Sequence, residues 1–399
     1  MLARLLTPAA DAMEADRRRA WFARVTIANF FFFLNFASFF LLPLHVRALG
    51  GSERTIGLVT GITGLSGLAS IFVVGTLLDR FGRTVFFRGG LAAMAICTLG
   101  FLFVDRIGPA LFVLRGLQGL AFAGAFNAAS TLAVELAPPE RRAAALGLFG
   151  ISTLTTHAVA PAFGELLIRL GGFPLLFVVA AGFSIVGLAI AWAVPEPPGD
   201  RHATGRTRLR ATRELRAAIG TVCCCGISFG TVITFVPTFV HDTRLEPVAT
   251  FFLSYTAAAV LIRLTAGGLG DTFGRPAVIQ PTLALLAVSL LLLAQVRSTI
   301  TLAGSAVLFG AAQGLVYPTL NAYAIDQAAA GQIGRAQTLY NGAFNLGVTT
   351  GSMALGPVVE ALGYRVTFAC AAAVALVGLG VFRLRGGQPR RWRATRRVR

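Results

Sequence analysis

The sequence has no lysine, little charge, and few of the side chains that build disulfide scaffolds or metal sites. Only 13% of its 399 residues are charged, and it has five cysteines, four histidines and four methionines. The cysteines lie in apolar segments and form neither a disulfide framework nor a CxxC metal knuckle. An HExxH pair, a nucleophile elbow and a phosphate-binding loop are also missing. We therefore expect no enzyme, no cofactor and no bound metal.

The apolar residues indicate a membrane protein. They make up 55% of the chain, more than a soluble protein of this length could bury in one or two cores. Stretches of about 20 mostly apolar residues, each long enough to cross about 30 Å of hydrocarbon, recur along the whole sequence. They predict twelve transmembrane helices at 22–45, 55–78, 85–104, 109–137, 143–168, 175–194, 217–241, 249–270, 277–296, 300–325, 336–361 and 366–384.

The net charge of +18 is carried by arginine alone. We number each loop by the predicted span that precedes it. Most arginines lie in the two terminal tails or in and close to the even-numbered loops. Two fall within spans, Arg115 and Arg263. The odd-numbered loops hold the rest: Arg47, Arg54, Arg106, Arg169, Arg244, Arg297 and Arg365. The positive-inside rule then places both termini in the cytoplasm. Anionic lipid accounts for the basic tails, and we expect no nucleic-acid partner.

A polar segment divides the apolar spans into two sets of six. Residues 195–216 are rich in proline and arginine and form the one long polar stretch between spans. The predicted organisation is an N-terminal tail at 1–21, a six-helix half at 22–194, the cytoplasmic linker at 195–216, a second half at 217–384 and a basic C-terminal tail at 385–399.

The two predicted halves share sequence features in the same order. The segment GTLLDRFGR at 75–83 reappears as GGLGDTFGR at 267–275, Gln118-Gly119 as Gln313-Gly314, and Pro161 as Pro357. The offsets are nearly constant, which favours duplication of a six-helix unit. Parallel six-helix repeats around a midplane site are an architecture of secondary transporters.

These segments resemble the signatures of the major facilitator superfamily. GTLLDRFGR is similar to the family's GxLaDrxGrr loop after the second span, and GGLGDTFGR to its weaker second copy. The fourth span, LRGLQGLAFAG, resembles the family's RxxqGxgaa motif, with Arg115 and Gln118 matching. The resemblance covers nearly the whole chain. It implies an all-α membrane fold of two pseudo-symmetric six-helix halves that transports by alternating access.

The resemblance also implies a latch on the cytoplasmic side, built from both loops. Glycine suits a tight turn between spans, and an acid there can face a helix N-terminus. Acids at the ends of spans four and ten add a second pair of contacts, Glu135 with Arg141 or Arg142 and Asp326 with Arg335. The predicted gating residues are Gly75, Asp79, Arg80, Gly82, Arg83, Glu135, Arg142, Asp271, Gly274, Arg275, Asp326 and Arg335. A solvated loop ion pair is the alternative interpretation of Asp79 and Arg83.

The fifth span departs from the family pattern. Drug antiporters typically carry a glycine-rich stretch ending GPxxGG there, whereas this chain keeps Pro161 and Gly164 but not the flanking glycines. The eleventh span keeps Gly347, Gly351 and Gly356. The departure leaves both export and import open, with export favoured.

Ionisable side chains at membrane depth are functional candidates. Arg115 lies about 9 Å from the predicted outer end of span four, and His157 about 21 Å from the cytoplasmic end of span five, at 1.5 Å per residue. Both would reach a similar level in the bilayer. One hypothesis makes His157 a proton-coupling group and Arg115 a substrate or relay charge. The alternative is that both only pack and hydrogen-bond between helices.

Spans one, four, seven and ten line the cavity in this family. Helical spacing places Gln313, Tyr317 and Asn321 on one face. The predicted cavity and coupling residues are Asn35, Phe36, Phe39, Arg115, Phe122, His157, Thr231, Phe235, Gln313, Tyr317 and Asn321. An aromatic wall with one cation and several amides suits an amphipathic or weakly anionic solute. Glu165 and Glu360 lie near the predicted outer ends of spans five and eleven. They are either outer-gate residues or solvated carboxylates.

Span seven contains a run of three cysteines, Cys223 to Cys225. This run suggests copper import as an alternative function, because thiolates bind soft metals. Adjacent residues of a helix point about 100° apart, so these three thiols cannot converge on one ion. Packing in the helix is the favoured interpretation.

The sequence as a whole favours a secondary active transporter of the bacterial inner membrane. We expect it to be a monomer among membrane lipids that moves a small organic solute by alternating access, coupled to protons and in the export direction. Import or facilitated diffusion of a metabolite, and a lipid or lysolipid flippase, remain open. A membrane sensor or scaffold without flux is a further alternative.

Overall fold

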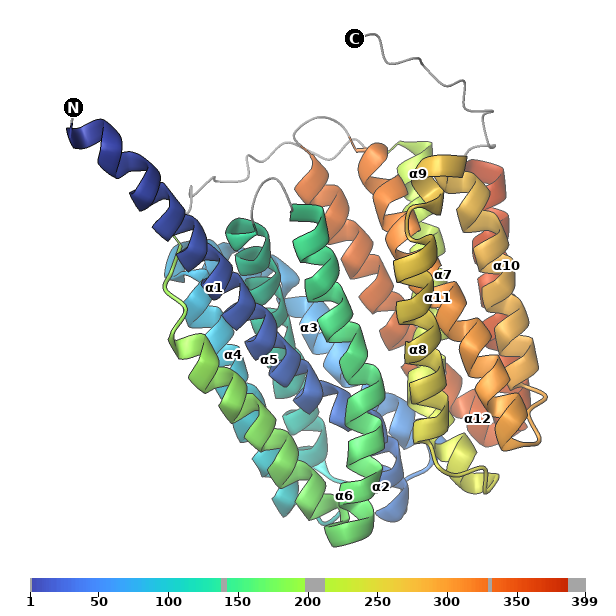
Figure 1. Cartoon of the computed structure of the whole chain (residues 1–399). Helices are drawn as coiled ribbons and strands as arrows, with labels where there is room; N and C mark the ends of the chain where they lie inside the picture. Colours follow the sequence, from blue (N-terminus) through green and yellow to red (C-terminus); the bar gives the residue numbers. More distant parts are fainter. Residues whose placement is uncertain (1, 138–141, 198–211, 329–331, 387–399) are drawn as a thin grey trace. The chain divides into compact units, whose positions relative to one another are not determined.

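The computed structural model describes residues 2–137, 142–197, 212–328 and 332–386, apart from the side chains of residues 2–15, 71–76, 79 and 143. The regular structure in these ranges is helical (Figure 1). The elements in chain order are α1 Leu2–Ser38, η1 Phe39–Leu41, α2 Leu42–Ala48, α3 Glu53–Phe81, α4 Arg83–Gly100, η2 Phe101–Phe103, α5 Pro109–Leu136, α6 Arg142–Trp192, α7 Arg213–Asp242, α8 Ala249–Ala266, α9 Leu269–Phe273, α10 Arg275–Leu293, α11 Thr299–Asp326 and α12 Ile333–Arg385. Each of the predicted apolar ranges lies on one to three of these elements, to within a few residues.

Nine helices in the described ranges are long and apolar enough to cross a membrane. Two of these candidate spans, within α6 and α12, contain 49 and 53 residues. A straight helix of that length would exceed 70 Å at about 1.5 Å per residue, against about 30 Å of hydrocarbon. Both helices are interrupted, α6 at Gly171 and Gly172 and α12 at Gly363. Each break coincides with a predicted loop between spans.

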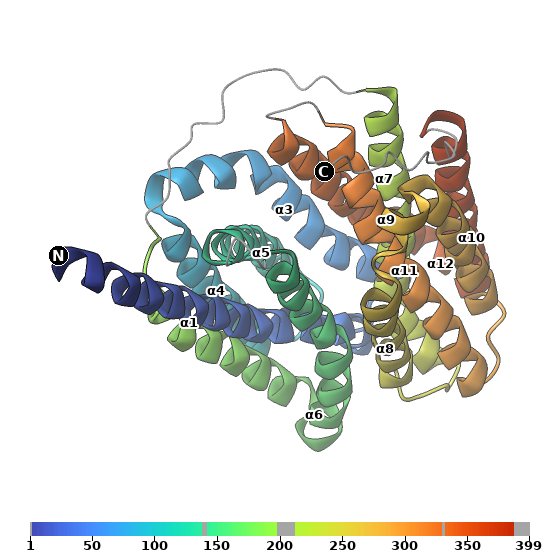
Figure 2. The ribbon, with the colours of Figure 1, turned by 45° about the horizontal axis from the view of Figure 1, so that its top comes forward.

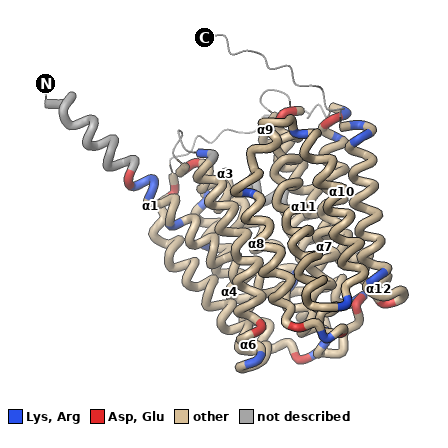
Figure 3. Tube along the Cα trace, turned by 45° about the vertical axis from the view of Figure 1, so that its right-hand side comes forward, with Lys and Arg blue, Asp and Glu red and all other residues tan. Residues whose placement is uncertain are grey.

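Glycine makes both turns possible. Gly172 has φ 70° and Gly363 has φ 80°, a region of backbone conformation that side chains with a β-carbon rarely adopt. In Figure 1, α6 consists of two segments that meet at such a turn. Figure 3 shows charged residues near the ends of the helices and almost none along their middles, as expected for segments surrounded by hydrocarbon.

The first compact unit comprises Met1–His45 and Leu65–Thr204. In it α1 packs against α6, and α4 packs against both α5 and α6; Figure 2 shows α1 running alongside α6. Small residues let α4 and α5 approach closely. A β-carbon added at Gly90 would lie 2.9 Å from the carbonyl oxygen of Ala121 and 2.6 Å from the β-carbon of Ala125. Membrane helices pack well through such small residues.

The second compact unit comprises Val46–Gly64 and Gly205–Arg399. Its most extensive helix pair is α7 with α12, followed by α8 with α11. Glycines bring the first pair into backbone contact. A β-carbon at Gly347 would lie 2.9 Å from the backbone nitrogen of Ile227, and one at Gly351 would lie 3.0 Å from the Ile227 carbonyl carbon. Gly226 and Gly230 on α7 face α12 in the same way.

Residues 46–64 belong to the second unit, although the sequence places them in the first predicted half. The reason is a small-residue face on the first part of α3. Side chains added at Gly57, Gly61 and Gly64 would collide with Ser352, Met353 and Thr349 of α12. The boundaries of the six-helix halves stay a prediction, and most of the predicted linker and C-terminal tail (198–211 and 387–399) lies outside the described residues.

Candidate functional site

Arg115 begins a chain of hydrogen bonds that joins four helices of the first unit. It lies on α5, 5% exposed, and donates through Nη1 to Gln118 Oε1 at 2.8 Å. Gln118 Nε2 donates to Thr98 Oγ1 on α4 at 3.4 Å, and Thr98 donates to Asn35 Oδ1 on α1 at 3.1 Å. Asn35 Nδ2 in turn donates to the Ala180 carbonyl of α6 at 2.7 Å. Buried polar groups need such partners where water is absent.

The aromatic residues predicted for the cavity form two different environments. Phe36 on α1 and Phe122 on α5 stack with ring centroids 4.4 Å apart, and both are half-buried. Phe39 is buried among other rings, 5.0 Å from Phe101. The Arg115 guanidinium lies 5.4 Å from the Phe39 centroid, a cation–π distance. The first unit therefore places one cation beside the ring of Phe39 on η1, while Phe36 and Phe122 form a separate stacked pair between α1 and α5.

His157 lies on the first segment of α6, half-buried, with its ring 5.1 Å from that of Phe40 and nearly perpendicular to it. This edge-to-face contact is a packing interaction and sets the orientation of the imidazole. The predicted proton-coupling role of His157 stays a prediction.

In the second unit, two of the predicted cavity residues are buried on α7. Thr231 donates to the Ile227 carbonyl of its own helix at 2.7 Å, and Phe235 has 0% exposure. Residues 231–240 are all buried, so this part of α7 has no exposed face. Whether Thr231 and Phe235 line a cavity stays a prediction.

The predicted residues of α11 have more open hydrogen-bonding capacity. Tyr317 donates to Asn341 Oδ1 at 3.0 Å and its carbonyl accepts from Tyr340 at 2.6 Å. Gln313 Nε2 and Asn321 Oδ1 are buried and have no hydrogen-bond partner among the described residues. The three side chains are spaced by one helical turn each, so the unsatisfied donor and acceptor flank Tyr317.

Arg83 ties the first glycine turn to the end of α5. Its Nη2 lies 3.0 Å from Glu135 Oε1, and the side chain is largely buried. The preceding residue, Gly82, has φ 98°, so the turn requires glycine. The second copy repeats the arrangement in the second unit.

There, Arg275 Nη1 lies 3.0 Å from Asp326 Oδ2 at the end of α11, and Arg275 follows Gly274, whose φ is 88°. Arg275 Nη2 is also 3.8 Å from Asp271 Oδ1. The sequence predicted both arginines and both acids as gating residues but did not pair them with each other. The remaining gating residues contribute less: Arg80, Asp271 and Arg142 are exposed, and Arg335 is half-buried. Gly75 and Asp79 lie on α3, and the side chain of Asp79 is outside the described part of the chain.

Glu196 was not predicted, yet it caps the N-terminus of α4. Its Oε1 accepts from the Arg83 backbone N–H at 2.7 Å, and its Oε2 from the Thr84 N–H at 2.8 Å and the Thr84 hydroxyl at 2.5 Å. Burial alone would raise the pKa of Glu196, but the Thr84 and Arg83 hydrogen bonds and the Arg83 charge lower it overall. The second copy has Pro276 where α4 has Thr84. Proline lacks the N–H that such a carboxylate would bind.

Replacing Glu196 with glutamine is expected to destabilise the chain by about 1 kcal/mol at neutral pH, the usual worth of an N-cap. Because the folded pKa lies below the ordinary value of 4.5, the carboxylate's contribution is complete above that value and is lost as the pH falls through the folded pKa. The difference in apparent melting temperature between wild type and Glu196→Gln should therefore shrink as the buffer is acidified. An equal difference at neutral and acidic pH would contradict the capping role.

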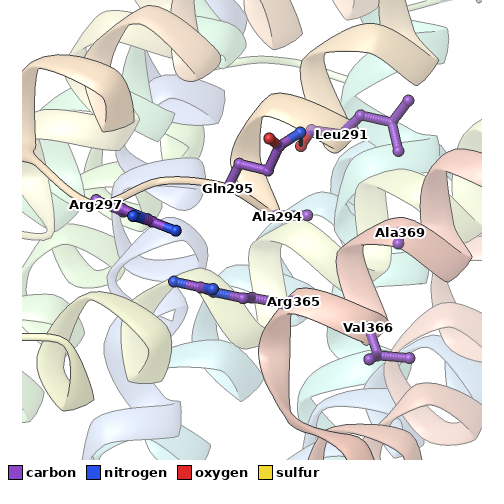
Figure 4. Close-up of a pocket in the computed structure, with 7 residues that line it drawn as sticks. All are labelled: Leu291, Ala294, Gln295, Arg297, Arg365, Val366 and Ala369. Atoms are coloured by element: carbon purple, nitrogen blue, oxygen red, sulfur yellow. Dashed lines mark hydrogen bonds between the residues drawn. The ribbon is translucent and has the colours of Figure 1, made fainter.

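A surface pocket of about 410 Å³ lies apart from these residues, at the end of α10 and the second segment of α12. Figure 4 shows the guanidinium groups of Arg297 and Arg365 opposite each other at its edge. The other lining residues are Leu291, Ala294, Gln295, Val366 and Ala369. Of the outer-gate candidates, Glu165 is half-buried and Glu360 is exposed.

Comparison with known families decides the class of protein. The sequence profile of the Major Facilitator Superfamily matches residues 25–261 and 218–399. The chain belongs to the major facilitator superfamily. Its all-helical fold is the one that the sequence predicted, and it is a multi-pass membrane transporter. The count of twelve spans and the cytoplasmic position of the termini stay predictions.

Relatives of known function place it among small-molecule transporters of this superfamily. The multidrug resistance protein MdtG of Proteus mirabilis is 28% identical over 391 residues, 91% of this chain and 96% of that protein. The staphylopine export protein of Staphylococcus aureus is 24% identical over 367 residues, covering 87% and 91%. The crystal structure of the nucleoside transporter NupG superposes with a TM-score of 0.76 at 15% identity, over 92% of this chain and 100% of that one, and shows the shared fold.

Proposed function

We propose that this superfamily member exports a small amphipathic or weakly anionic organic solute across the bacterial inner membrane, driven by proton entry. The observation that carries the proposal is Arg115, a cation with 5% exposure whose guanidinium lies 5.4 Å from the centroid of the Phe39 ring. A buried cation in an apolar surrounding attracts a negative group, and aromatic rings bind apolar surface.

The second unit supports a partly polar substrate. Gln313 Nε2 offers an unused donor and Asn321 Oδ1 an unused acceptor on the same face of α11. An unsatisfied buried polar atom is unfavourable by about 1–3 kcal/mol, so a solute that bonds to one gains that energy on binding. A substrate with an acceptor and a donor suits these two residues of the second unit.

The direction of transport is supported by the relatives. The two curated relatives described above are named for multidrug resistance and for export, and both come from bacteria. We carry the export direction and the bacterial inner membrane to this chain on that basis.

The gating contacts are compatible with a two-state cycle. The Arg83–Glu135 and Arg275–Asp326 pairs each join a glycine turn to the end of a neighbouring long helix. We propose that these pairs break and re-form as the transporter changes state and that His157 takes part in proton coupling. Replacing His157 with alanine would then uncouple transport from pH.

Everted membrane vesicles test direction and energy source together. Vesicles from cells that express the chain are given a panel of amphipathic cations, organic anions and metabolites, with a proton gradient acid inside. We expect at least one amphipathic or anionic compound to accumulate and the accumulation to vanish when an uncoupler is added. Loss of a preloaded compound under the same gradient would point to import, and equilibration without accumulation to a facilitator. Movement of labelled lysolipids alone would support the flippase alternative.

A further inference from the structure

A buried acid that has no part in the proposed cavity lies at the start of α3. Glu53 is 5% exposed and precedes the predicted second span. Three side chains from three other elements surround it: Arg47 of α2, Asp242 of α7 and Tyr364 at the turn of α12. All four residues belong to the second compact unit. Sequence reasoning treated Arg47 as a loop cation and did not single out the other three.

Tyr364 stands between the two carboxylates. Its hydroxyl oxygen lies 2.7 Å from Glu53 Oε1 and 2.9 Å from Asp242 Oδ2. Arg47 Nη2 lies 2.8 Å from Glu53 Oε1 and 3.2 Å from the Tyr364 oxygen, and it also forms an ion pair with Asp242. Thr238 Oγ1 lies 3.4 Å from Glu53 Oε2. One positive charge therefore serves two carboxylates.

The oxygen–oxygen distances require one more proton than the ionised groups possess. Each of the two Tyr364 contacts is a hydrogen bond only if a proton lies between its oxygens. The tyrosine hydroxyl supplies one such proton, and two ionised carboxylates supply none. A proton on Glu53 Oε1 completes the set. Glu53 then donates to the Tyr364 oxygen, Tyr364 donates to Asp242, and Arg47 balances the charge of Asp242.

We propose that Glu53, Tyr364, Asp242 and Arg47 form a proton-binding site, and that the bound proton fastens residues 46–64 to α7 and α12. Release of the proton leaves two carboxylates, the buried Glu53 and the partly exposed Asp242, against one arginine, and favours separation of these segments. The use of this site as a coupling site for transport rests on the proposed function, whereas the proton binding does not.

The electrostatics agree in direction. Burial raises the pKa of Glu53, against the opposing effects of the Tyr364 hydrogen bond and the Arg47 charge, and Asp242 raises it further. The pKa of Glu53 is raised while residues 46–64 are packed against α7 and α12, so this packing takes up a proton. Acid therefore favours the packed arrangement, and a rising pH favours separation of these segments. Near this end of the elements, Arg54, His241, Arg244, Glu246, Glu360 and Arg365 are exposed, whereas His45 on α2 is buried. His241 is paired with Glu246 at 2.9 Å.

The packing around the site is close enough to respond to a single proton. A β-carbon at Gly356 of α12 would lie 2.8 Å from the Glu53 carbonyl oxygen and 3.1 Å from the Arg54 Cα. The two helices thus touch through backbone atoms next to the cluster, and a small separation there would break the Glu53–Tyr364 bond. If the termini are cytoplasmic, the site lies on the outer side of the membrane, which is the acidic side. A proton taken up from that side would then favour packing of residues 46–64 against α7 and α12.

Infrared titration of the full chain in lipid nanodiscs tests the proton site without any substrate. We expect a protonated-carboxyl band that titrates above the ordinary range of a glutamate and disappears in Glu53→Gln. Asp242→Asn removes the competing negative charge and should lower that midpoint, whereas Arg47→Gln should raise it. Glu360→Gln, an exposed acid of α12, is the matched control and should leave the band in place. A band that survives Glu53→Gln, or a Glu53 midpoint at the ordinary value, would overturn the assignment.

Spin-label distances test the fastening. With the five native cysteines replaced, labels at positions 54 and 360 report the separation of α3 from α12. Acidification from about pH 8 to about pH 5 should shift the population toward the short distance in the wild-type background. In Glu53→Gln the short distance should persist at both pH values, because glutamine is neutral like the protonated acid. A distance distribution insensitive to pH in both backgrounds would refute the fastening, and neither result depends on whether the chain exports a solute.

Discussion

Alanine in place of Arg115 is expected to lower transport by about 10- to 100-fold while the protein stays folded. The charged hydrogen bond to Gln118 and the cation–π contact with Phe39 are both lost. Loss of an interaction with a charged group is worth about 1.5–3 kcal/mol, and 1.4 kcal/mol corresponds to about a tenfold change. Initial rates of solute flux in proteoliposomes, normalised to protein, give the measurement.

Two further variants separate substrate binding from packing. Arg115→Lys keeps the charge but not the planar guanidinium, so we expect partial activity with a raised KM. Arg106→Ala removes an exposed arginine from the loop before α5 and should transport normally. If Arg115→Ala transports at the wild-type rate with only its melting temperature lowered, Arg115 is a packing residue and the proposed anion site is wrong.

Alanine at Gly347 should strongly destabilise the second unit. The new carbon would meet backbone atoms of Cys223 and Ile227, which cannot rotate away as a flexible side chain could, so α7 and α12 must separate. Overpacking of this kind is unfavourable by about 1–3 kcal/mol. The apparent melting temperature in detergent and the monodisperse yield should both fall.

Gly380 provides the matched control on the same helix. A β-carbon there meets nothing within 4 Å, so Gly380→Ala should leave the melting temperature unchanged or slightly raised. Equal effects of the two substitutions would show that helix propensity, and not the α7–α12 contact, sets the outcome.

The fold was predictable because hydrocarbon imposes strong limits on sequence. Apolar runs of about 20 residues are hard to mistake, and the breaks at Gly172 and Gly363 coincide with the predicted loops. The glycine turns at Gly82 and Gly274 were likewise visible as a repeated motif. Arg115 stood out in the sequence because few charged residues occur within spans, and in the structure its side chain is 5% exposed.

Contacts between distant segments were not predictable from spacing. Arg83 and Glu135 were both singled out, but only the packing of α4 on α5 makes them partners. Glu196 lies in a proline-rich segment that reads as a linker, and nothing local distinguishes a capping carboxylate from a solvated one. In the sequence, Glu53 is likewise an acid at the end of a loop. Its burial follows from the glycines of α3 several residues later, which pack against α12.

Helical periodicity cannot identify a functional face on α7. It marks a functional face only when one side of a helix is exposed, and residues 231–240 are buried on every side. Phe235 therefore has the same sequence signature whether it lines a pathway or fills a core. On α11 the amides at Gln313 and Asn321 gave a clearer signal, because amides are uncommon in an apolar span and need partners.

The most direct test of the proposed proton-coupled export is proton movement in proteoliposomes that contain a trapped pH dye. A compound that accumulates in everted vesicles is added in a pulse on one side, without any imposed gradient. Our account predicts that its movement drives protons in the opposite direction, and that the proton signal is lost in Arg115→Ala and retained in Arg106→Ala. Tracer flux of the same compound with no change in internal pH would contradict proton coupling and identify the chain as a facilitator.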